Sequence, residues 1–500
     1  MTKQGGFPRP GAVGLPFHRR LNVVAICQRL TFVAVNLVFF LPAFAQEPDI
    51  RSFAGEAWYG VYMNGEKAGF SSSVFEVADS GTVKVVEDVT FRLRMSGVKQ
   101  DMRVVTTREF AADGTLTLIE SSVDDTGGKK EFRVTVEGKT MTVRTRVGGN
   151  ETVTTAPRPQ ESLADTLALE RFVRSGPAVG ASVTYRMYEP MYSTEIEGTS
   201  WVVSITERLL DGTPTKVFEI KSVLAPLGVE QTSFVAEDGT TLEDSLAGTI
   251  TLRLEPKEIA MNVDYANDVI VANAAKLDKP LPDARTRESV TLDIHGPLAK
   301  EHFVEDGRQS FKQTESTVRF TGKRIAADAV KSVPLPITDT ALLEWTKPSM
   351  FVQSDSPELA AKAKEIVGEE TDALTVSSKL SEWVYRNVRS TYSARLTNSL
   401  EVLDTMEGDC TEHSMLFIGL ARAAGIPARE VAGLIYAASP DPGFYFHQWA
   451  TVWVGQWIDV DPTFNQPIAD ATHIKLAEGD LLEQARLLPV IGRLTIEVVE

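Results

Sequence analysis

The sequence predicts an α+β protein in which a β-rich antiparallel region precedes a domain that changes from helices to strands. Alternating apolar and polar residues, with turn signals between them, run through residues 47–255. Helical periodicity begins near residue 356, and strand-like runs return at residues 446–461. A chain of 500 residues exceeds the size of a single hydrophobic core, so two or three domains are expected.

Residues 1–45 have the pattern of a secretory signal peptide. Basic residues precede an apolar run at residues 30–40, and Ala43-Phe44-Ala45 provides a small-x-small cleavage site. The apolar run is shorter than the roughly 20 residues that span a membrane comfortably. We expect cleavage after Ala45, export to the periplasm or cell envelope, and no stable membrane span in the mature chain. An uncleaved membrane anchor is the alternative.

Charge and composition restrict the partners of the mature chain. Cleavage removes five basic and no acidic residues and changes the net charge from −17 to −22. An acidic surface does not favour nucleic acid or anionic lipid, so no nucleic-acid partner is expected. Hydrophobic residues make up 43% and charged residues 24% of the chain, as in ordinary soluble globular proteins.

Residues 46–255 are predicted to form an antiparallel β region. Asn64-Gly65 between two alternating runs favours a type I′ hairpin turn, because both turn residues need positive φ. One helix is expected from Ser162 to Arg174, with Ser162 as N-cap and Asp165 three residues later. The pattern fits two related curved sheets, or one long sheet wrapped on a helix. It weakly resembles the half-barrel folds of bacterial envelope proteins, which implies a scaffold or a ligand-recognition role.

Residues 256–345 are predicted to be a small β module or a linker, with strands near residues 290–295 and 316–321. Residues 346–500 form the last predicted domain. It begins with a helix capped by Ser356 and ended by Gly368, and with a second amphipathic helix at residues 374–388.

Cys410 is the most informative residue of this last domain. The only other cysteine, Cys27, leaves with the signal peptide, so the exported chain keeps one thiol. Cys410 stands at the start of an apolar helix that ends at Gly425-Ile-Pro427. The unpaired N–H groups of a helix N-terminus favour a thiolate, so we expect a lowered thiol pKa and a place for a developing oxyanion.

A predicted hairpin follows, and its register decides whether His447 can meet Asp461. A two-residue loop at Gly455-Gln456 would put them on opposite faces. A three-residue loop, or a one-residue bulge, pairs Trp453 with Trp457 and places His447 and Asp461 on one face. That register also gathers aliphatic residues on the other face, so we predict it. These residues are Ala450, Val452, Val454, Ile458 and Val460.

The order Cys410, His447, Asp461 is typical of a cysteine nucleophile with a histidine base and an orienting carboxylate. Asp459 competes with Asp461 for the third role but lies farther from His447 along the strand. A zinc site of Cys410, His413 and His447 lacks a fourth ligand, so neither metal nor other cofactor is expected. His413 is interpreted as supporting or structural, and His473 has no assignable role.

These residues resemble the transglutaminase-like superfamily. The resemblance rests on residues 408–414, on residues 420–429, on His447-x-Trp449 and on Trp457-x-x-x-Asp-Pro-Thr463. It implies a papain-like core over residues 355–470 and a catalytic triad that maps onto Cys410, His447 and Asp461. It also implies acyl transfer from glutamine amides to amines, deamidation, or hydrolysis of peptide and amide bonds.

Two features depart from the family pattern. Gln448 stands where the family often has a small residue after the histidine, and Thr451 stands where it often has an acidic residue two positions beyond the tryptophan. These differences affect the groove rather than the triad. The second oxyanion donor is unplaced, with Tyr392 as a candidate.

Two functions remain open at this point. The first is an exported cysteine-dependent acyl transferase or amide or peptide hydrolase that acts through a thioester on Cys410, with a protein or peptide amide as substrate. The alternative is a non-catalytic envelope binding or assembly protein with a relic papain-like domain. The sequence leaves open hydrolysis against transfer, the substrate and the oligomeric state.

Overall fold

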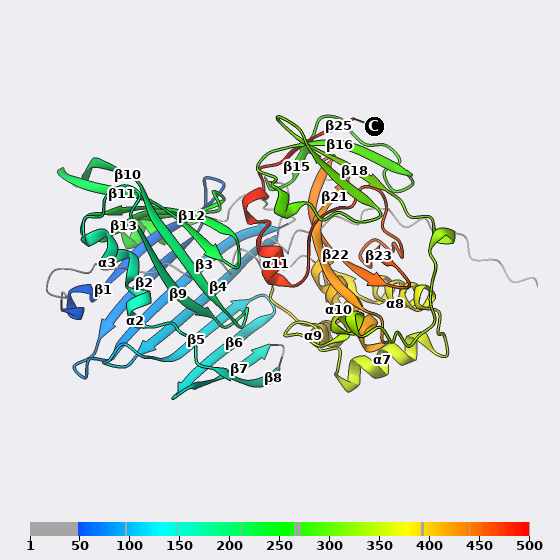
Figure 1. Ribbon diagram of the computed structural model, residues 1–500, viewed down its shortest axis with the longest axis horizontal. Coiled ribbons are helices and arrows are strands. Elements are labelled where there is room, and N and C mark those ends of the chain that lie inside the picture. Colours follow the sequence, from blue (N-terminus) through cyan, green and yellow to red (C-terminus); the bar gives the residue numbers. More distant parts are fainter. Residues whose placement is uncertain are drawn as a thin grey trace, which may run out of the picture.

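The computed structural model describes residues 49–499, except for residues 96–97, 148, 211, 265–267, 269–271, 392–394 and 440. The predicted signal peptide therefore lies outside the described residues. The protein is mostly β, with a large antiparallel sheet formed by the first half of the chain and a second sheet with helices formed by the rest (Figure 1). Among the described residues, no helix has both the length and the hydropathy that crossing a membrane requires.

The first sheet has fourteen strands in the order β8-β7-β6-β5-β4-β3-β2-β1-β14-β13-β12-β11-β10-β9. The chain thus forms one long sheet rather than two separate halves. Asn64 and Gly65 join β1 to β2 with φ angles of 48° and 85°, which confirms the predicted turn. The strands are β1 (Gly55–Met63), β2 (Glu66–Val77), β3 (Val83–Met95), β4 (Val98–Phe110), β5 (Leu116–Asp125), β6 (Gly128–Glu137), β7 (Thr140–Val147), β8 (Asn150–Pro157), β9 (Ser182–Glu189), β10 (Thr194–Leu210), β11 (Thr213–Ala225), β12 (Val229–Ala236), β13 (Thr241–Leu246) and β14 (Ile250–Leu254).

The expected helix after residue 162 is present as two consecutive pieces, α2 (Leu163–Thr166) and α3 (Ala168–Arg174). Ser162 and Asp165 form the capping box that their spacing predicts. Apolar side chains of both helices pack against residues of the sheet, which buries one face of each helix. Three other short helices lie in this half or just after it: η1 (Ile50–Phe53), α4 (Lys257–Ala260) and η2 (Lys300–His302).

The second sheet has the order β17-β18-β16-β25-β15-β22-β21-β24, with β23 paired to β22. Residues 256–345, expected to be a small module or linker, supply β15 to β18 to this sheet, beside strands of the last domain. The domain boundaries themselves stay a prediction. The strands are β15 (Ala275–Leu277), β16 (Ser289–His295), β17 (Gln309–Gln313), β18 (Val318–Lys323), β21 (Ala428–Ala437), β22 (Gly443–Trp453), β23 (Trp457–Val460), β24 (Ile474–Glu478) and β25 (Thr495–Val498).

Helices α7 to α10 gather on one side of the second sheet (Figure 1). Ser356 caps α7 and Gly368 ends it with φ 64°, as the sequence predicts. The helices are α7 (Pro357–Val367), α8 (Ala373–Asn387), α9 (Ser399–Thr405) and α10 (Cys410–Ala423). The remaining elements are η3 (Ala327–Ala329), α6 (Thr340–Leu343), η4 (Glu344–Thr346), α11 (Leu481–Ala485), η5 (Leu488–Val490) and the short parallel pair β19 (Arg389–Ser390) and β20 (Glu407–Gly408).

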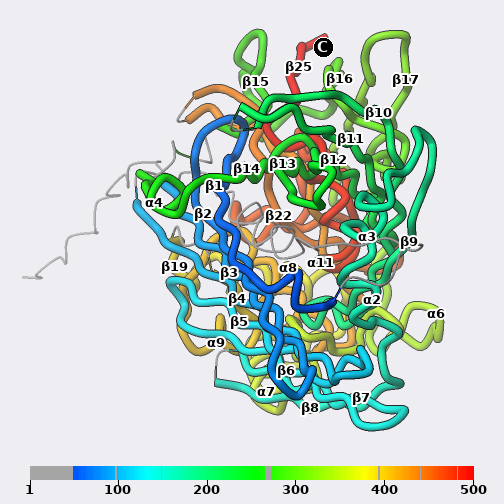
Figure 2. The backbone as a smooth tube through the Cα atoms, turned by 90° about the vertical axis from the view of Figure 1, so that its left-hand side faces the viewer, coloured from blue at the N-terminus to red at the C-terminus, as the bar shows by residue number. Residues whose placement is uncertain are grey.

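The two sheets share one continuous apolar core, with α11 lying between them (Figure 1). Figure 2 views the first sheet from outside, with the orange and red segments of the second behind it. Polar contacts also join the two halves. The Asp125 carboxylate, at the end of β5, accepts the backbone N–H of Leu396 at 2.6 Å, and the Thr249 hydroxyl donates to the Leu488 carbonyl at 3.1 Å.

Gly433 in β21 lets β22 and β24 approach it closely from both sides. It pairs with His447 of β22 and with Lys475 of β24. A Cβ atom there would collide with the backbone carbonyl oxygen of Ile474 and would touch the Trp449 ring. Gly433→Ala should therefore lower the free energy of unfolding by about 1–3 kcal/mol, measured by urea denaturation.

The matched control is Gly55→Ala in β1, where the nearest atom to a new Cβ is 4.0 Å away. It should leave the free energy of unfolding nearly unchanged. Equal stability of the two variants would contradict the close approach at Gly433.

Candidate active site

Cys410 is the first residue of α10, where the sequence places it. Asp409 caps the helix by accepting the Thr411 N–H at 2.8 Å, and Glu412 in turn accepts the Asp409 N–H at 2.8 Å. The first three turns of α10 are buried all round, because the helix lies between the other helices and the sheet. The Cys410 side chain is completely buried.

The hairpin of β22 and β23 has the register that the chemistry requires. Trp453 pairs with Trp457 across the three-residue loop at residues 454–456, which confirms the predicted pairing. The predicted aliphatic face is also confirmed, because all five of its residues lie in the core beneath the helices. His447 and Asp461 consequently share the other face, and the His447 Nε2 to Asp461 Oδ2 distance is 2.9 Å.

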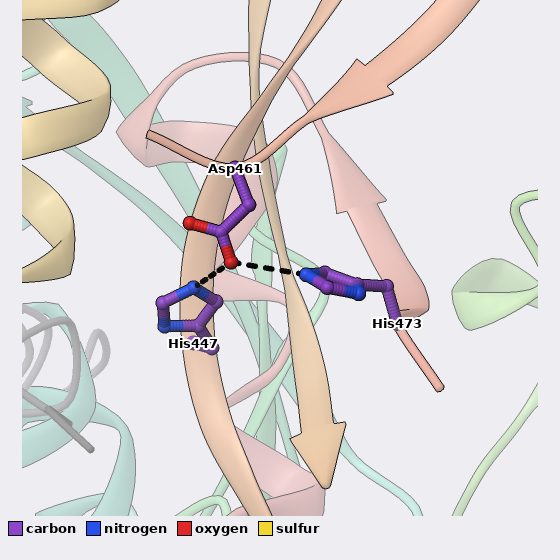
Figure 3. Close-up of side chains that lie close together, drawn as sticks. All are labelled: His447, Asp461 and His473. Carbon is purple, nitrogen blue, oxygen red and sulfur yellow. Dashed lines mark hydrogen bonds and ion pairs between the residues drawn. The ribbon is translucent and has the colours of Figure 1, made fainter. Parts of the chain in front are cut away.

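Hydrogen bonding fixes the tautomer of His447. A carboxylate oxygen only accepts, so Nε2 must carry the hydrogen that it donates to Asp461. The other ring nitrogen, Nδ1, is buried and has no hydrogen-bond partner among the described residues. Nδ1 points away from Asp461 (Figure 3). Its lone pair is therefore available to take a proton, which is what a general base needs.

Asp461 is held as a carboxylate. Its Oδ1 accepts the backbone N–H groups of Thr463 at 2.8 Å and Phe464 at 3.2 Å, while Oδ2 faces two histidines. Burial alone would raise the pKa of Asp461, but the electrostatic interaction with His447 and the hydrogen bonds from both rings hold it far below its ordinary value. Trp449 stacks beside the His447 ring, and Phe464 packs against it from the loop.

The Cys410 thiol corrects one expectation. Burial raises its pKa well above the ordinary value, the charge of Asp409 adds to this, and a hydrogen bond to the Gln448 backbone only partly opposes it. Burial also lowers the pKa of His447. The helix N-terminus was expected to lower the thiol pKa. At a fully enclosed position, however, the lost hydration of the thiolate raises the pKa by more than the helix N-terminus lowers it. The resting pair is thus a neutral thiol and a neutral imidazole.

His473, to which the sequence assigned no role, is part of the cluster. It lies in the loop just before β24, and its Nε2 is 3.0 Å from Asp461 Oδ2, the oxygen that His447 also binds (Figure 3). Its Nδ1 lies 3.2 Å from Asp470 Oδ1. The Asp470-x-x-His473 spacing, shortly after the Asp-Pro-Thr motif, is the one signal that could have suggested a second buried pair.

The competing candidates have other partners. The Asp459 carboxylate forms ion pairs with Arg308 at 3.0 Å and Lys475 at 2.8 Å, all three side chains being buried. His413 Nδ1 contacts the Asp409 carbonyl oxygen at 2.5 Å inside α10. Tyr392, the candidate for the second oxyanion donor, lies outside the described residues, so that assignment stays a prediction.

The donor atoms of His447, Asp461 and His473 lie within 4.8 Å of one another, so this trio has the donor set of a divalent-metal site. The two histidine-to-carboxylate distances, however, are those of hydrogen bonds. The expectation that the protein uses no metal stays a prediction.

The ion pairs of Asp459 generate a prediction about stability and pH. Burial would raise the pKa of Asp459, but Lys475 and Arg308 lower it to about 2. A lowered carboxyl pKa contributes stability above the ordinary value near 4 that is lost as the pH falls toward 2. Asp459→Asn should cost about 3–5 kcal/mol at pH 7, because buried Arg308 loses its carboxylate partner and buried Lys475 keeps only Asp306 and Glu478. The difference from the unchanged protein should shrink steadily as unfolding is measured between pH 5 and pH 3.

The control is Glu382→Gln, which breaks the exposed pair between Glu382 and Arg386. Its effect on unfolding should stay below about 1 kcal/mol. An Asp459→Asn variant as stable as this control at pH 7 would show that the buried pairs contribute nothing.

The comparisons with known proteins bear on the last third of the chain. The family model of the transglutaminase-like superfamily matches residues 360–462, which include Cys410, His447 and Asp461. An uncharacterised protein of Haemophilus influenzae is 33% identical over 86 residues, which are 16% of this chain and 23% of that protein. The chain thus matches less than a quarter of that relative.

Solved structures are similar to this chain at low levels. A candidate cysteine protease from Cytophaga hutchinsonii is 19% identical, with a TM-score of 0.29 over 42% of this chain and 83% of that one. A β-barrel-like protein of unknown function from Brucella abortus is 11% identical, with a TM-score of 0.32 over 40% of this chain and 94% of that one. At these TM-scores neither likeness assigns a fold. The family match alone identifies residues 360–462 as a transglutaminase-like superfamily domain.

Proposed function

We propose that the protein is an exported, cysteine-dependent acyl transferase or amide or peptide hydrolase that forms a thioester on Cys410. The observation that carries the proposal is the state of His447. Its Nε2 is bonded to a buried carboxylate, and its Nδ1 is buried without a partner. The N-terminus of α10 places the thiol against the backbone of Gln448, the residue that follows His447.

The proposed reaction has two half-reactions. The Cys410 sulfur attacks the carbonyl carbon of an amide while His447 Nδ1 takes the thiol proton. The C–N bond then breaks, His447 returns the proton to the leaving amine, and a thioester remains. Water or an amine attacks the thioester carbonyl carbon and gives a proton to His447, the C–S bond then breaks, and His447 returns the proton to the Cys410 sulfur. Water yields an acid, whereas an amine yields a new amide.

Electrostatics favour coupled proton transfer over a preformed ion pair. A raised thiol pKa and a lowered imidazole pKa both oppose charge separation in the resting site. The imidazolium that forms during attack is stabilised by the Asp461 carboxylate at 2.9 Å. His447 therefore takes the thiol proton mainly when the substrate carbonyl is already in place. This limits reaction of the thiol with other molecules.

Export is part of the proposal and rests on the signal-peptide pattern of residues 1–45. A protein or peptide amide of the cell envelope is the proposed substrate.

The decisive measurement is mass spectrometry of mature protein exposed to envelope extract and quenched in acid. We expect a mass increase that maps to the peptide containing Cys410 and is absent from Cys410→Ala. Asp461→Asn should form the adduct roughly 10²–10⁴ times more slowly, because the imidazole loses its orienting carboxylate. Equal rates of adduct formation on Cys410 in Asp461→Asn and in the unchanged protein would contradict the proposed triad.

One observation favours the alternative of a non-catalytic envelope binding or assembly protein. Cys410, His447 and Asp461 are all buried, so a substrate carbonyl reaches the thiol only if the surrounding chain moves. Under this alternative, the Cys410→Ala variant would fully complement a strain from which the protein has been deleted. Under the catalytic proposal it would not.

A further inference from the structure

We propose that His473 is a positioning residue of this site: held between Asp470 and Asp461, its ring fixes the Asp461 carboxylate against His447. The inference rests on the proposed function and deepens it, because it adds a second histidine and a second aspartate to the three residues that the sequence indicates. The contacts form one chain from His447 through Asp461 and His473 to Asp470.

The two neighbours of His473 determine its protonation. Its Nε2 faces Asp461 Oδ2 at 3.0 Å and its Nδ1 faces Asp470 Oδ1 at 3.2 Å. Both neighbours are carboxylate oxygens, which accept and do not donate. Each ring nitrogen must therefore carry a hydrogen, so His473 is an imidazolium in this arrangement. Burial opposes that charge, but Asp470 and the bonds to both carboxylates raise the pKa of His473 above its ordinary value.

Asp470 is itself held firmly as a carboxylate. Its Oδ1 accepts the N–H of Thr472 at 2.8 Å and the Thr472 hydroxyl at 2.6 Å. Its Oδ2 accepts from Gln466 and from Arg285, each at 2.9 Å. The chain of contacts thus ends at Arg285, whose side chain is partly exposed. Charges alternate along it, from Asp461 to His473, Asp470 and Arg285, so each buried charge has an opposite neighbour.

No other charged side chain bonds the His473 ring among the described residues. The Trp449 ring meets it edge to face, with centroids 5.1 Å apart, and the His447 ring lies 6.3 Å away. Arg308 donates to the His473 backbone carbonyl at 2.7 Å and is paired with Asp459, which also binds Lys475. The His473 charge therefore acts mainly on Asp461, Asp470 and, through Asp461, on His447.

This arrangement has two consequences for His447. The bond from His473 holds Asp461 Oδ2 in position, so the His447 ring keeps its orientation. Burial is the main cause of the lowered pKa of His447, and the positive charge of His473, which offsets part of the Asp461 charge, lowers that pKa further. A lower pKa keeps His447 unprotonated at mildly acidic pH and makes it a better proton donor to the leaving amine.

Two variants separate the hydrogen bond from the charge. His473→Gln keeps an N–H that can reach Asp461 but removes the charge, whereas His473→Leu removes both. The rate of Cys410 alkylation by iodoacetamide is measured from pH 5 to pH 9, with His295→Gln on β16 as the control histidine. At its optimum pH, the alkylation rate of His473→Gln should stay within about threefold of that of the unchanged protein. The acid limb, the acidic side of its pH–rate profile where the rate falls, should move to higher pH. We expect His473→Leu to react roughly 10–100 times more slowly.

A spectroscopic measurement tests the charge without any reaction. In full-length mature protein labelled with ¹⁵N-histidine, one imidazole should remain doubly protonated at neutral pH, and its signal should vanish in His473→Gln. A neutral His473 at pH 7 would overturn the inference, as would unchanged rates and an unchanged acid limb in both variants. Stoichiometric Zn²⁺ binding that His473→Gln abolishes would also overturn it, because the ring would then be a metal ligand.

The proposed function and this inference fail separately. If no acyl adduct forms on Cys410, the proposed function fails, while the protonated His473 signal and the shifted acid limb still report the positioning contact. If the adduct forms and His473 is neutral, the inference fails alone. Should His473→Leu not fold, His473→Gln and the ¹⁵N spectrum still decide.

Discussion

The hydrogen bond between His447 Nε2 and Asp461 Oδ2 is the contact on which the rest of the site depends. It exists because the three-residue loop between β22 and β23 sets a register that turns both side chains to one face. The same register sends Ala450, Val452 and Ile458 into the core beneath the helices. A one-residue slip of the hairpin would expose these core residues and would also separate His447 from Asp461. The packing of the core therefore stabilises the register that brings His447 and Asp461 together.

Burial then decides how the site can work. Water is excluded from Cys410, His447 and Asp461, so every charge must be matched by a neighbour of opposite sign or be suppressed. The carboxylates meet this demand through backbone N–H groups, histidines and arginines, whereas the thiol and His447 stay neutral. The pattern suits a mechanism in which charge appears only during reaction, next to groups that are already oriented.

The first sheet contributes to this enclosure through the shared core and through contacts with the segment before α9. Leu396 donates its N–H to Asp125 of the first sheet, and Asn398, which caps α9, donates to the Val147 carbonyl at 3.3 Å. The same segment reaches the cysteine helix, because Arg395 lies 3.6 Å from Glu412 in the α10 capping box. These contacts connect the first sheet to the start of α10, so a structural change in that sheet can reach the cysteine helix.

The sequence by itself determined the elements whose signals are local. Alternation, the Asn64-Gly65 turn, the helix caps and the hairpin loop indicated the strands, the helices and the pairing of Trp453 with Trp457, because each depends on residues close in the chain. The tertiary structure alone decided the rest. It joined β15 to β18 with the last domain's strands, gave His473 a place beside Asp461, and raised the Cys410 pKa by burial. Those outcomes depend on which distant segments pack together and on how much water they exclude, which no local pattern records.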